Sequence, residues 1–386
     1  MVAHGVSGFV ALLGAAVVIA ILAERLRIPA AVALVALGAL VQIPPPFAFG
    51  ETLLTVFLPP LIFEAAWNLD AASLRRTAAR IVVLALPGTL FTAFAVAAAL
   101  AATGALPFAA ALLFGAIVAA TDPVAVVAAF RAVEIPLDLK TLIEGESLFN
   151  DGVALVLFGI ALALASGNGV SLPAAVLNGA VAIAGGIAVG TVLALLCTFV
   201  LRATSAAEYE VTITLVLAYG AYEIASFFGW SGIFATAASA IVLRAAVAAL
   251  PGAIANAVEV DRIWSAAAFV ANATVFLATG LLIQPARIAH EPVLVIVAVV
   301  TVWATRAVLA LVTFRGNAGR ITAFLAGMRG ALPLALALEL PDSLAFRPQI
   351  IDGTFAVVLA TTVLQGIPLV PVVGRLYGKT RAPETA

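Results

Sequence analysis

The sequence predicts an all-α protein that crosses a membrane many times. Hydrophobic residue types make up 64% of the 386 residues and charged types only 10%, whereas a soluble domain carries roughly a quarter charged residues. The mean hydropathy is +1.21, and apolar runs of about 20 residues, long enough to span a bilayer core as a helix, recur along the chain. The net charge of −1 gives no basic balance of the kind that indicates nucleic-acid binding.

Charges, prolines and glycines divide the chain into about thirteen candidate transmembrane helices. The first candidate is interpreted as a helix and not as a cleaved signal peptide, because it lacks a basic start and many more spans follow. The second and third candidates are short. The candidates run approximately over residues 6–26, 28–43, 51–67, 79–103, 107–130, 141–166, 173–202, 209–228, 231–250, 260–283, 291–313, 320–340 and 350–373.

The basic residues of the loops predict the orientation in the membrane. The odd-numbered loops and the C-terminal tail hold most of the Lys and Arg, whereas the even-numbered loops hold only Arg287 and Arg347. Cytoplasmic loops collect basic residues, so we expect a multi-pass plasma-membrane protein with its N-terminus outside and its C-terminus in the cytoplasm. The tail at 374–386 is short, so no regulatory cytoplasmic domain is expected.

Two candidates carry an interruption inside an apolar run. Asp122 and Pro123 interrupt the fifth candidate, and proline breaks a helix because it lacks the N–H group and clashes with the preceding turn. Arg329, flanked by glycines and a proline, interrupts the twelfth candidate. Backbone groups freed in lipid are tolerated only when protein or a water-filled cavity surrounds them. The interruptions therefore predict irregular backbone at the centre of the protein.

The two interrupted candidates are seven helices apart, and this spacing predicts two inverted six-helix halves. The whole chain, 1–386, would form one transmembrane domain: a first repeat at about 6–166, a linking helix at about 173–202 and a second repeat at about 209–373. Interrupted helices at matching positions of inverted halves indicate the midplane binding site of a transporter. Simple kinks are the alternative, since Pro and Gly are common in membrane helices, but the charges at both breaks disfavour it.

The stretch EGESLFNDG at 144–152 places carboxylates in the sixth candidate. We expect Asp151 about two helical turns inside this span, where a carboxylate must face a cavity, pair with a cation or be protonated. Glu146 is expected to form a salt bridge with Arg329 of the other broken helix, which is interpreted as the only deeply placed basic residue. Asp151 would then have no permanent partner, so it could hold a proton or a metal cation but hardly both.

An acidic side chain that alternates between a proton and a cation predicts ion exchange. Hard alkali ions prefer oxygen ligands, and Ser147, the amide oxygen of Asn150 and the backbone freed at 121–123 could supply them beside Asp151. Because position 150 is not a second aspartate, one negative charge alternates between one proton and one monovalent cation, which predicts electroneutral 1:1 exchange. Asp122 is expected to cap a half-helix end, with direct ion contact as the alternative.

Four motifs together resemble the cation:proton antiporter superfamily, specifically the sodium/proton exchangers of the NhaP and NHE branch. They are FLPPLIFEAAW at 57–67, ATDPVAV at 120–126, GESLFNDGVALVLF at 145–158 and GMRGALPLALAL at 327–338. The resemblance implies an NhaA-like antiporter fold of thirteen helices, with broken helices crossing in a mobile six-helix core and a second domain at a homodimer interface. It also implies exchange of Na⁺ or Li⁺ for protons without a cofactor.

The same resemblance assigns roles to single positions. Asp151 is similar to the essential aspartate that binds both the cation and the proton, and Asn150 matches the asparagine beside it. Glu146 and Arg329 match the family's structural ion pair. The ligands that it implies for Na⁺ are Asp151, Ser147, Thr121 and, in some members, Glu64.

Several alternatives remain open at this point. The same fold could carry K⁺ or a small organic substrate instead of Na⁺. An intramembrane protease could use Ser147, but no histidine or lysine base lies in the membrane beside it; an aspartyl dyad of Asp122 and Asp151 would not explain the inverted pattern. A non-transporting sensor is disfavoured because no soluble output domain is expected. Glu64 could tether a neighbouring helix instead of binding the ion. We expect Asn272 and Arg306 to make interhelical bonds or packing contacts, with no direct role in ion binding.

Overall fold

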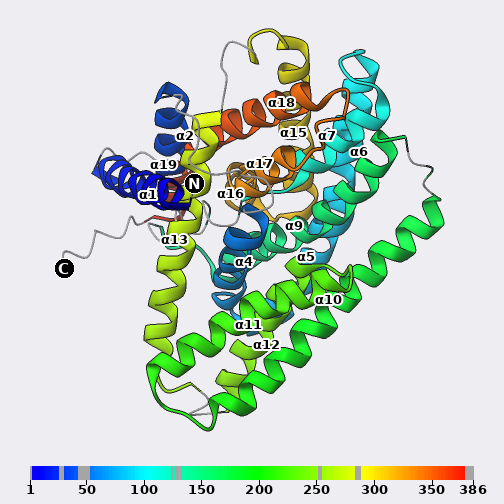
Figure 1. Ribbon diagram of the computed structural model, residues 1–386. Coiled ribbons are helices and arrows are strands. Elements are labelled where there is room, and N and C mark those ends of the chain that lie inside the picture. Colours follow the sequence, from blue (N-terminus) through cyan, green and yellow to red (C-terminus); the bar gives the residue numbers. More distant parts are fainter. Residues whose placement is uncertain are drawn as a thin grey trace.

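The computed structural model is built almost entirely from helices (Figure 1). It describes residues 2–25, 30–41, 53–122, 126, 130, 133–167, 169, 171–250, 254–282 and 288–378. The predicted all-α class is confirmed. Pro123, Arg287 and the end of the tail lie outside the described residues.

The elements of the first half include two π-helical turns. A π-helical turn precedes α4, and a second one, which contains Pro87, joins α5 to α6. The elements are α1 (Val2–Arg25), α2 (Ala30–Val41), η1 (Leu53–Phe57), α4 (Leu58–Trp67), α5 (Ala71–Val83), η2 (Leu84–Gly88), α6 (Thr89–Ala102), α7 (Phe108–Ala119) and α9 (Leu137–Ala165).

The second half contains the second broken helix, split into α16 and α17. Its elements are α10 (Leu172–Leu201), α11 (Ala207–Phe227), α12 (Gly232–Ala249), α13 (Ala257–Leu282), α15 (Pro292–Thr313), α16 (Gly316–Leu325), α17 (Ala331–Leu338), α18 (Arg347–Thr361), η3 (Thr362–Gly366) and α19 (Ile367–Tyr377). Each predicted span overlaps helical residues. In the described part of the chain, seven continuous helical stretches are long and apolar enough to cross a membrane, so the count of thirteen crossings stays a prediction.

The helices pack in two groups. Helices α5, α6, α7, α9 and α15 to α19 contact one another and form what we call the crossed bundle; α1, α2, α4 and α10 to α13 form the flanking bundle. Figure 1 shows α16 and α17 near the middle of the molecule, with α10, α11 and α12 along one edge. Helix α9 contacts α4, α10 and α12, and α17 contacts α13, so these elements meet at the boundary between the bundles.

Within the flanking bundle, α2 and α13 approach closely where two glycines meet. A Cβ atom on Gly38 would lie 2.6 Å from the carbonyl oxygen of Leu277 and 2.7 Å from the Cα atom of Gly280. Small residues permit such close backbone approach between helices in membranes. This contact fixes the position of α13 relative to α2.

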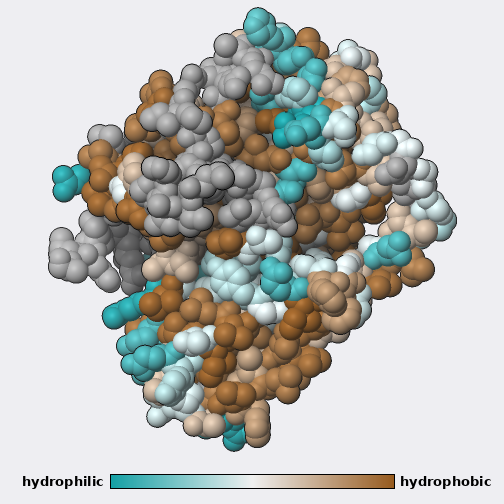
Figure 2. Space-filling view, in the orientation of Figure 1, coloured by the Kyte–Doolittle hydropathy of each residue, from teal (hydrophilic) through white to brown (hydrophobic). Residues whose placement is uncertain are grey.

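The outer surface is apolar over large areas. Helix α10, for example, exposes large apolar side chains along its whole length. Figure 2 shows hydrophobic residues over much of the visible face. Soluble monomers rarely expose patches of this extent, whereas lipid chains are a suitable environment for them. The exposed residues of α10 include Val176, Leu177, Val192, Leu195, Leu196 and Phe199.

Candidate functional site

The two interruptions lie against each other at the centre of the crossed bundle. The backbone N–H of Asp122 donates to the carbonyl oxygen of Met328 at 2.9 Å. The backbone N–H of Arg329 donates to the hydroxyl oxygen of Thr361 at 3.1 Å. Protein groups therefore satisfy these backbone donors at both interruptions, as an apolar environment requires.

Two glycines of the second interruption leave room for charged side chains. A Cβ atom on Gly330 would collide with the carboxyl group of Asp122. A Cβ atom on Gly327 would lie 2.6 Å from Nε of Arg306. The GMRG sequence thus accommodates one carboxylate from the first interruption and one guanidinium from α15.

Glu146 pairs with Arg306, and the predicted pair of Glu146 with Arg329 is wrong. Nη1 of Arg306 donates to the two carboxylate oxygens of Glu146 at 3.0 and 2.9 Å, and Nε donates to the carbonyl of Ala323 at 2.8 Å. Both partners are almost fully buried, with 3% and 4% of their side chains exposed. The sequence did not predict this pair. Arg306 reaches Glu146 only because Gly327 has no side chain, and the sequence of α15 does not show this.

Arg329 is buried without a carboxylate bound to its guanidinium in the described structure. The residue is 2% exposed, and Nε and Nη1 have no hydrogen-bond partner among the described residues. Its backbone is held on both sides, because Thr361 accepts from the N–H and the hydroxyl of Thr362 donates to the carbonyl at 3.4 Å. These backbone contacts, and not the predicted ion pair, position Arg329.

Three polar side chains connect the first interruption to α9. The hydroxyl oxygens of Thr121 and Ser147 are 2.7 Å apart. Asn150 donates from Nδ2 to the Thr121 hydroxyl at 2.7 Å and to Glu146 at 3.2 Å, and its Oδ1 accepts from the backbone N–H of Thr121 at 3.2 Å. The structure brings these predicted residues together, but the Asn150 amide oxygen, which was expected to face the ion, accepts a backbone N–H.

Asp151 lies in the middle of α9, deeper than the sequence predicts. The helix begins at Leu137, directly after Pro136, so Asp151 is well beyond two turns from the start of this 29-residue helix. The residue is 5% exposed, and its Oδ1 has no hydrogen-bond partner among the described residues. No guanidinium lies within 4.0 Å of it in the described part of the chain, so this carboxylate is not locked in a salt bridge.

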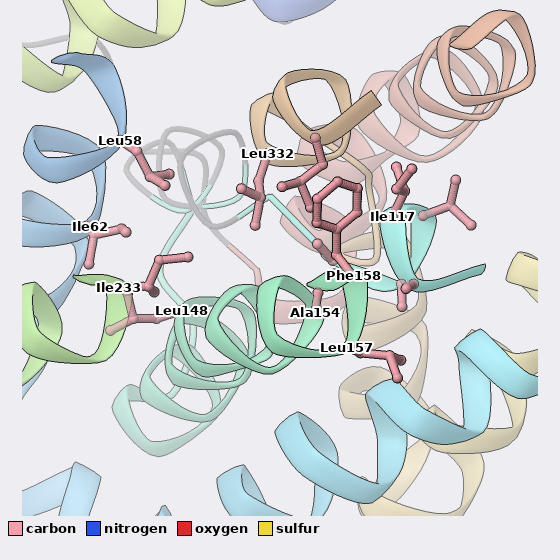
Figure 3. Packing of buried hydrophobic residues seen from close by; sticks show 14 of the residues in the cluster. Leu58, Ile62, Ile117, Leu148, Ala154, Leu157, Phe158, Ile233 and Leu332 are labelled. Carbon is pink, nitrogen blue, oxygen red and sulfur yellow. The ribbon is translucent and has the colours of Figure 1, made fainter. Parts of the chain in front are cut away.

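A small cavity borders Asp151 at the boundary between the bundles. The centre of a water molecule can occupy a volume of about 20 Å³ inside this cavity. That volume suffices for roughly one water molecule or one ion of similar size. Figure 3 shows four of its apolar lining residues, Leu58, Ile62, Leu148 and Leu332, within one cluster of buried hydrophobic side chains. Its polar lining residues are Thr121, Asp122, Asp151 and Asn272, and its apolar ones are Leu58, Leu61, Ile62, Leu148, Ala331 and Leu332.

Three of the predicted ligands, Ser147, Asn150 and Glu64, do not line this cavity. Ser147 reaches it only through its contact with Thr121. Glu64 is 3% exposed, and its Oε1 accepts from Nδ2 of Asn68, one turn further along α4, at 2.9 Å. Sequence reasoning missed Asn272 as a lining residue, because a single asparagine in an apolar helix does not show which neighbour it faces.

The sequence comparisons agree with this geometry. The family described as "Sodium/hydrogen exchanger, transmembrane" matches residues 11–375. The chain belongs to this family. It is a family of multi-pass membrane transporters and not of enzymes, so the intramembrane-protease interpretation is set aside.

Relatives and a solved structure extend the match over nearly the whole chain. The Na(+)/H(+) antiporter NhaH of Halobacillus aidingensis is 31% identical over 95% of this chain and 96% of its own length. The Na(+)/H(+) antiporter ApNhaP of Aphanothece halophytica is 33% identical over 84% of this chain, which spans only 65% of that relative. The sodium proton antiporter MjNhaP1 from Methanocaldococcus jannaschii is 22% identical with a TM-score of 0.79, covering 95% of this chain and 99% of its own. That likeness confirms the predicted antiporter fold.

Proposed function

We propose that this exchanger exchanges one monovalent cation, Na⁺ or Li⁺, for one proton across the plasma membrane, with Asp151 as the shared site. The observation that carries the proposal is the unpartnered Oδ1 of Asp151 beside a cavity of about one-ion size. Relatives that match most of this chain are named Na⁺/H⁺ antiporters. K⁺ in place of Na⁺ is the alternative on the same fold.

Competition for one carboxylate couples the two ions. A proton bound to Asp151 removes its charge, and a bound cation compensates it, so each ion displaces the other. An unloaded carboxylate buried in an apolar environment costs several kcal/mol. The empty site therefore resists moving past the apolar residues of α4, and loaded forms move instead.

The first interruption supplies further ligands. Thr121 and Asp122 line the cavity with Asp151, and hydroxyl, carboxylate and carbonyl oxygens are the donors that hard cations prefer. Ser147 and Asn150 position the Thr121 hydroxyl through their bonds of 2.7 Å. Glu64 accepts from Asn68, the residue that follows α4, and does not line the cavity.

Alternating access follows from the two-bundle packing. The crossed bundle carries Asp151 and both interruptions, whereas the flanking bundle supplies Leu58 and Ile62 on the other side of the cavity. Sliding of the crossed bundle along this apolar surface would open the cavity to one side or the other. In this proposal the flanking bundle also forms the homodimer interface, and the C-terminus is cytoplasmic.

The test is flux in proteoliposomes loaded in turn with Na⁺, Li⁺ or K⁺ gradients. Wild-type protein should move protons against Na⁺ or Li⁺, and Asp151→Asn should abolish this coupled flux while the protein still elutes as a folded species. Asp138→Asn is the matched control, because Asp138 is an exposed carboxylate at the start of the same helix. Undiminished Na⁺-driven proton flux in Asp151→Asn would overturn the assignment; flux with K⁺ alone would select the alternative ion.

A further inference from the structure

Asn272 lines the cavity from the opposite bundle and has an amide oxygen that no hydrogen bond uses in the described structure. It lies on α13 and lines the cavity with Asp151. Its Oδ1 is buried and has no hydrogen-bond partner among the described residues. Buried polar atoms are nearly always hydrogen-bonded, so an unmet acceptor beside a cavity calls for a specific explanation.

The arrangement does not fit interhelical glue. A bonding role between helices would engage the amide oxygen, and the described structure shows no such bond for Asn272. The expectation from the sequence that Asn272 joins helices therefore lacks support in the geometry.

We propose that Asn272 is a ligand of the transported cation, supplied by the flanking bundle, and that it contributes to cation affinity and selectivity. This inference rests on the proposed cation exchange at Asp151. An amide oxygen is a hard, neutral donor of the kind that alkali ions prefer. Because it is neutral, it adds a ligand without changing the charge balance of a one-for-one exchange.

The position on α13 makes the contact depend on conformation. Asp151 and Thr121 belong to the crossed bundle, whereas α13 is held against α2 at Gly38 and Gly280. The cation would therefore have its full set of ligands only when the two bundles meet as they do here. A proton on Asp151 is bound covalently and needs no such set, so removing the Asn272 oxygen should weaken cation binding and leave proton binding unchanged.

The variant Asn272→Leu removes the amide at similar size, and Thr274→Val is its matched control. Thr274 is two residues further along α13 and fully buried, and its hydroxyl also lacks a partner among the described residues, but it does not line the cavity. Loss of one bond to a charged species predicts a rise of roughly tenfold or more in the apparent KM for Na⁺ in Asn272→Leu. Thr274→Val should keep the wild-type value.

Equilibrium binding of ²²Na⁺ to the purified protein gives a readout independent of transport, with Asp151→Asn as the blank. Asn272→Leu should bind Na⁺ roughly tenfold more weakly, with an altered Na⁺ to Li⁺ ratio. Asn272→Asp, which keeps an oxygen at the same reach, should bind at least as tightly as wild type at alkaline pH and carries the test if the leucine variant does not fold.

Three outcomes overturn one idea or the other. Wild-type Na⁺ binding in Asn272→Leu, with none in Asp151→Asn, would refute the ligand role and leave the exchange site intact. Equal losses in Asn272→Leu and Thr274→Val, or a loss in Asn272→Asp, would show that α13 acts through packing and would also refute it. Wild-type binding in Asp151→Asn would refute the proposed function itself.

Discussion

Arg306→Met removes the guanidinium that holds Glu146 in the described structure. The variant loses two charge-assisted bonds to Glu146, at 3.0 and 2.9 Å, and the 2.8 Å bond to the carbonyl of Ala323. Asn150, at 3.2 Å, is the remaining donor to this carboxylate. Removing one partner of a buried ion pair leaves an uncompensated charge, which costs about 3–5 kcal/mol.

Arg329→Met is the matched comparison, because it removes a guanidinium of equal burial. Nε and Nη1 of Arg329 have no hydrogen-bond partner in the described part of the chain, and the backbone contacts that hold residue 329 do not depend on its side chain. Burying a charge without a bonded partner is costly, so an apolar side chain of similar volume removes that cost. We therefore expect Arg329→Met to lose much less stability than Arg306→Met.

The assay is the free energy of unfolding, measured by titrating SDS into mixed micelles. For Arg306→Met the unfolding equilibrium should shift by about two to more than three powers of ten, which corresponds to the 3–5 kcal/mol above. The double variant Glu146→Gln, Arg306→Met should cost less than the sum of the two single changes, because they share one interaction. An equal or larger loss in Arg329→Met would refute the pairing drawn from the structure.

Three further predictions concern single positions. Asn150→Asp puts a carboxylate oxygen where an amide N–H now donates to Glu146 at 3.2 Å, so the SDS midpoint should fall by the equivalent of about 2 kcal/mol. Gly330→Ala forces Asp122 to move, so Na⁺-driven proton flux should be lost in proteoliposomes. The carboxylate of Asp70 accepts a hydrogen bond from a backbone N–H in the first turn of α5, and this bond lowers the pKa of Asp70. Asp70→Ala should therefore lower the free energy of unfolding by a constant amount at neutral pH, where the carboxylate is charged. The difference from wild type should vanish in acid, as the pH falls through the folded-state pKa.

The sequence predicts those features of the fold that depend on composition and local breaks. Every span predicted from an apolar run overlaps a helix of the structure. Both interruptions were predicted from the residues around Asp122 and Arg329, because helix breakers and intramembrane charges act locally. Asp151 lies in no salt bridge in the described part of the chain, but the expectation was based on a pair of Glu146 with Arg329 that the structure does not contain. The depth of Asp151 was underestimated, since Pro136 starts the helix and polar residues after it gave no apolar signal.

The choice of partners could not be predicted in the same way. Glu146 and Arg306 are 160 positions apart, and both buried arginines satisfied the rule that a buried carboxylate needs a cation. The structure distinguishes them through Gly327, whose missing side chain admits Arg306. The role of Asn272 was equally open, because the sequence shows a polar residue in an apolar helix but not whether another helix or a cavity lies next to it.

The charge balance of the buried residues around the two interruptions gives a second reason to expect one-for-one exchange. Among the described residues around the two interruptions, three carboxylates, Asp122, Glu146 and Asp151, and two guanidiniums, Arg306 and Arg329, are buried. Glu144, also buried, pairs with Lys140 at 3.8 Å. The empty site therefore carries one net negative charge. One proton or one Na⁺ neutralises it, and a neutral site crosses an apolar layer without the cost of several kcal/mol that an unpaired charge incurs. Exchange rates in proteoliposomes should therefore be the same when a K⁺ gradient with valinomycin clamps the membrane potential at zero, inside negative or inside positive. A rate that follows the imposed potential would mean that another titrating group takes part, and would refute this charge count.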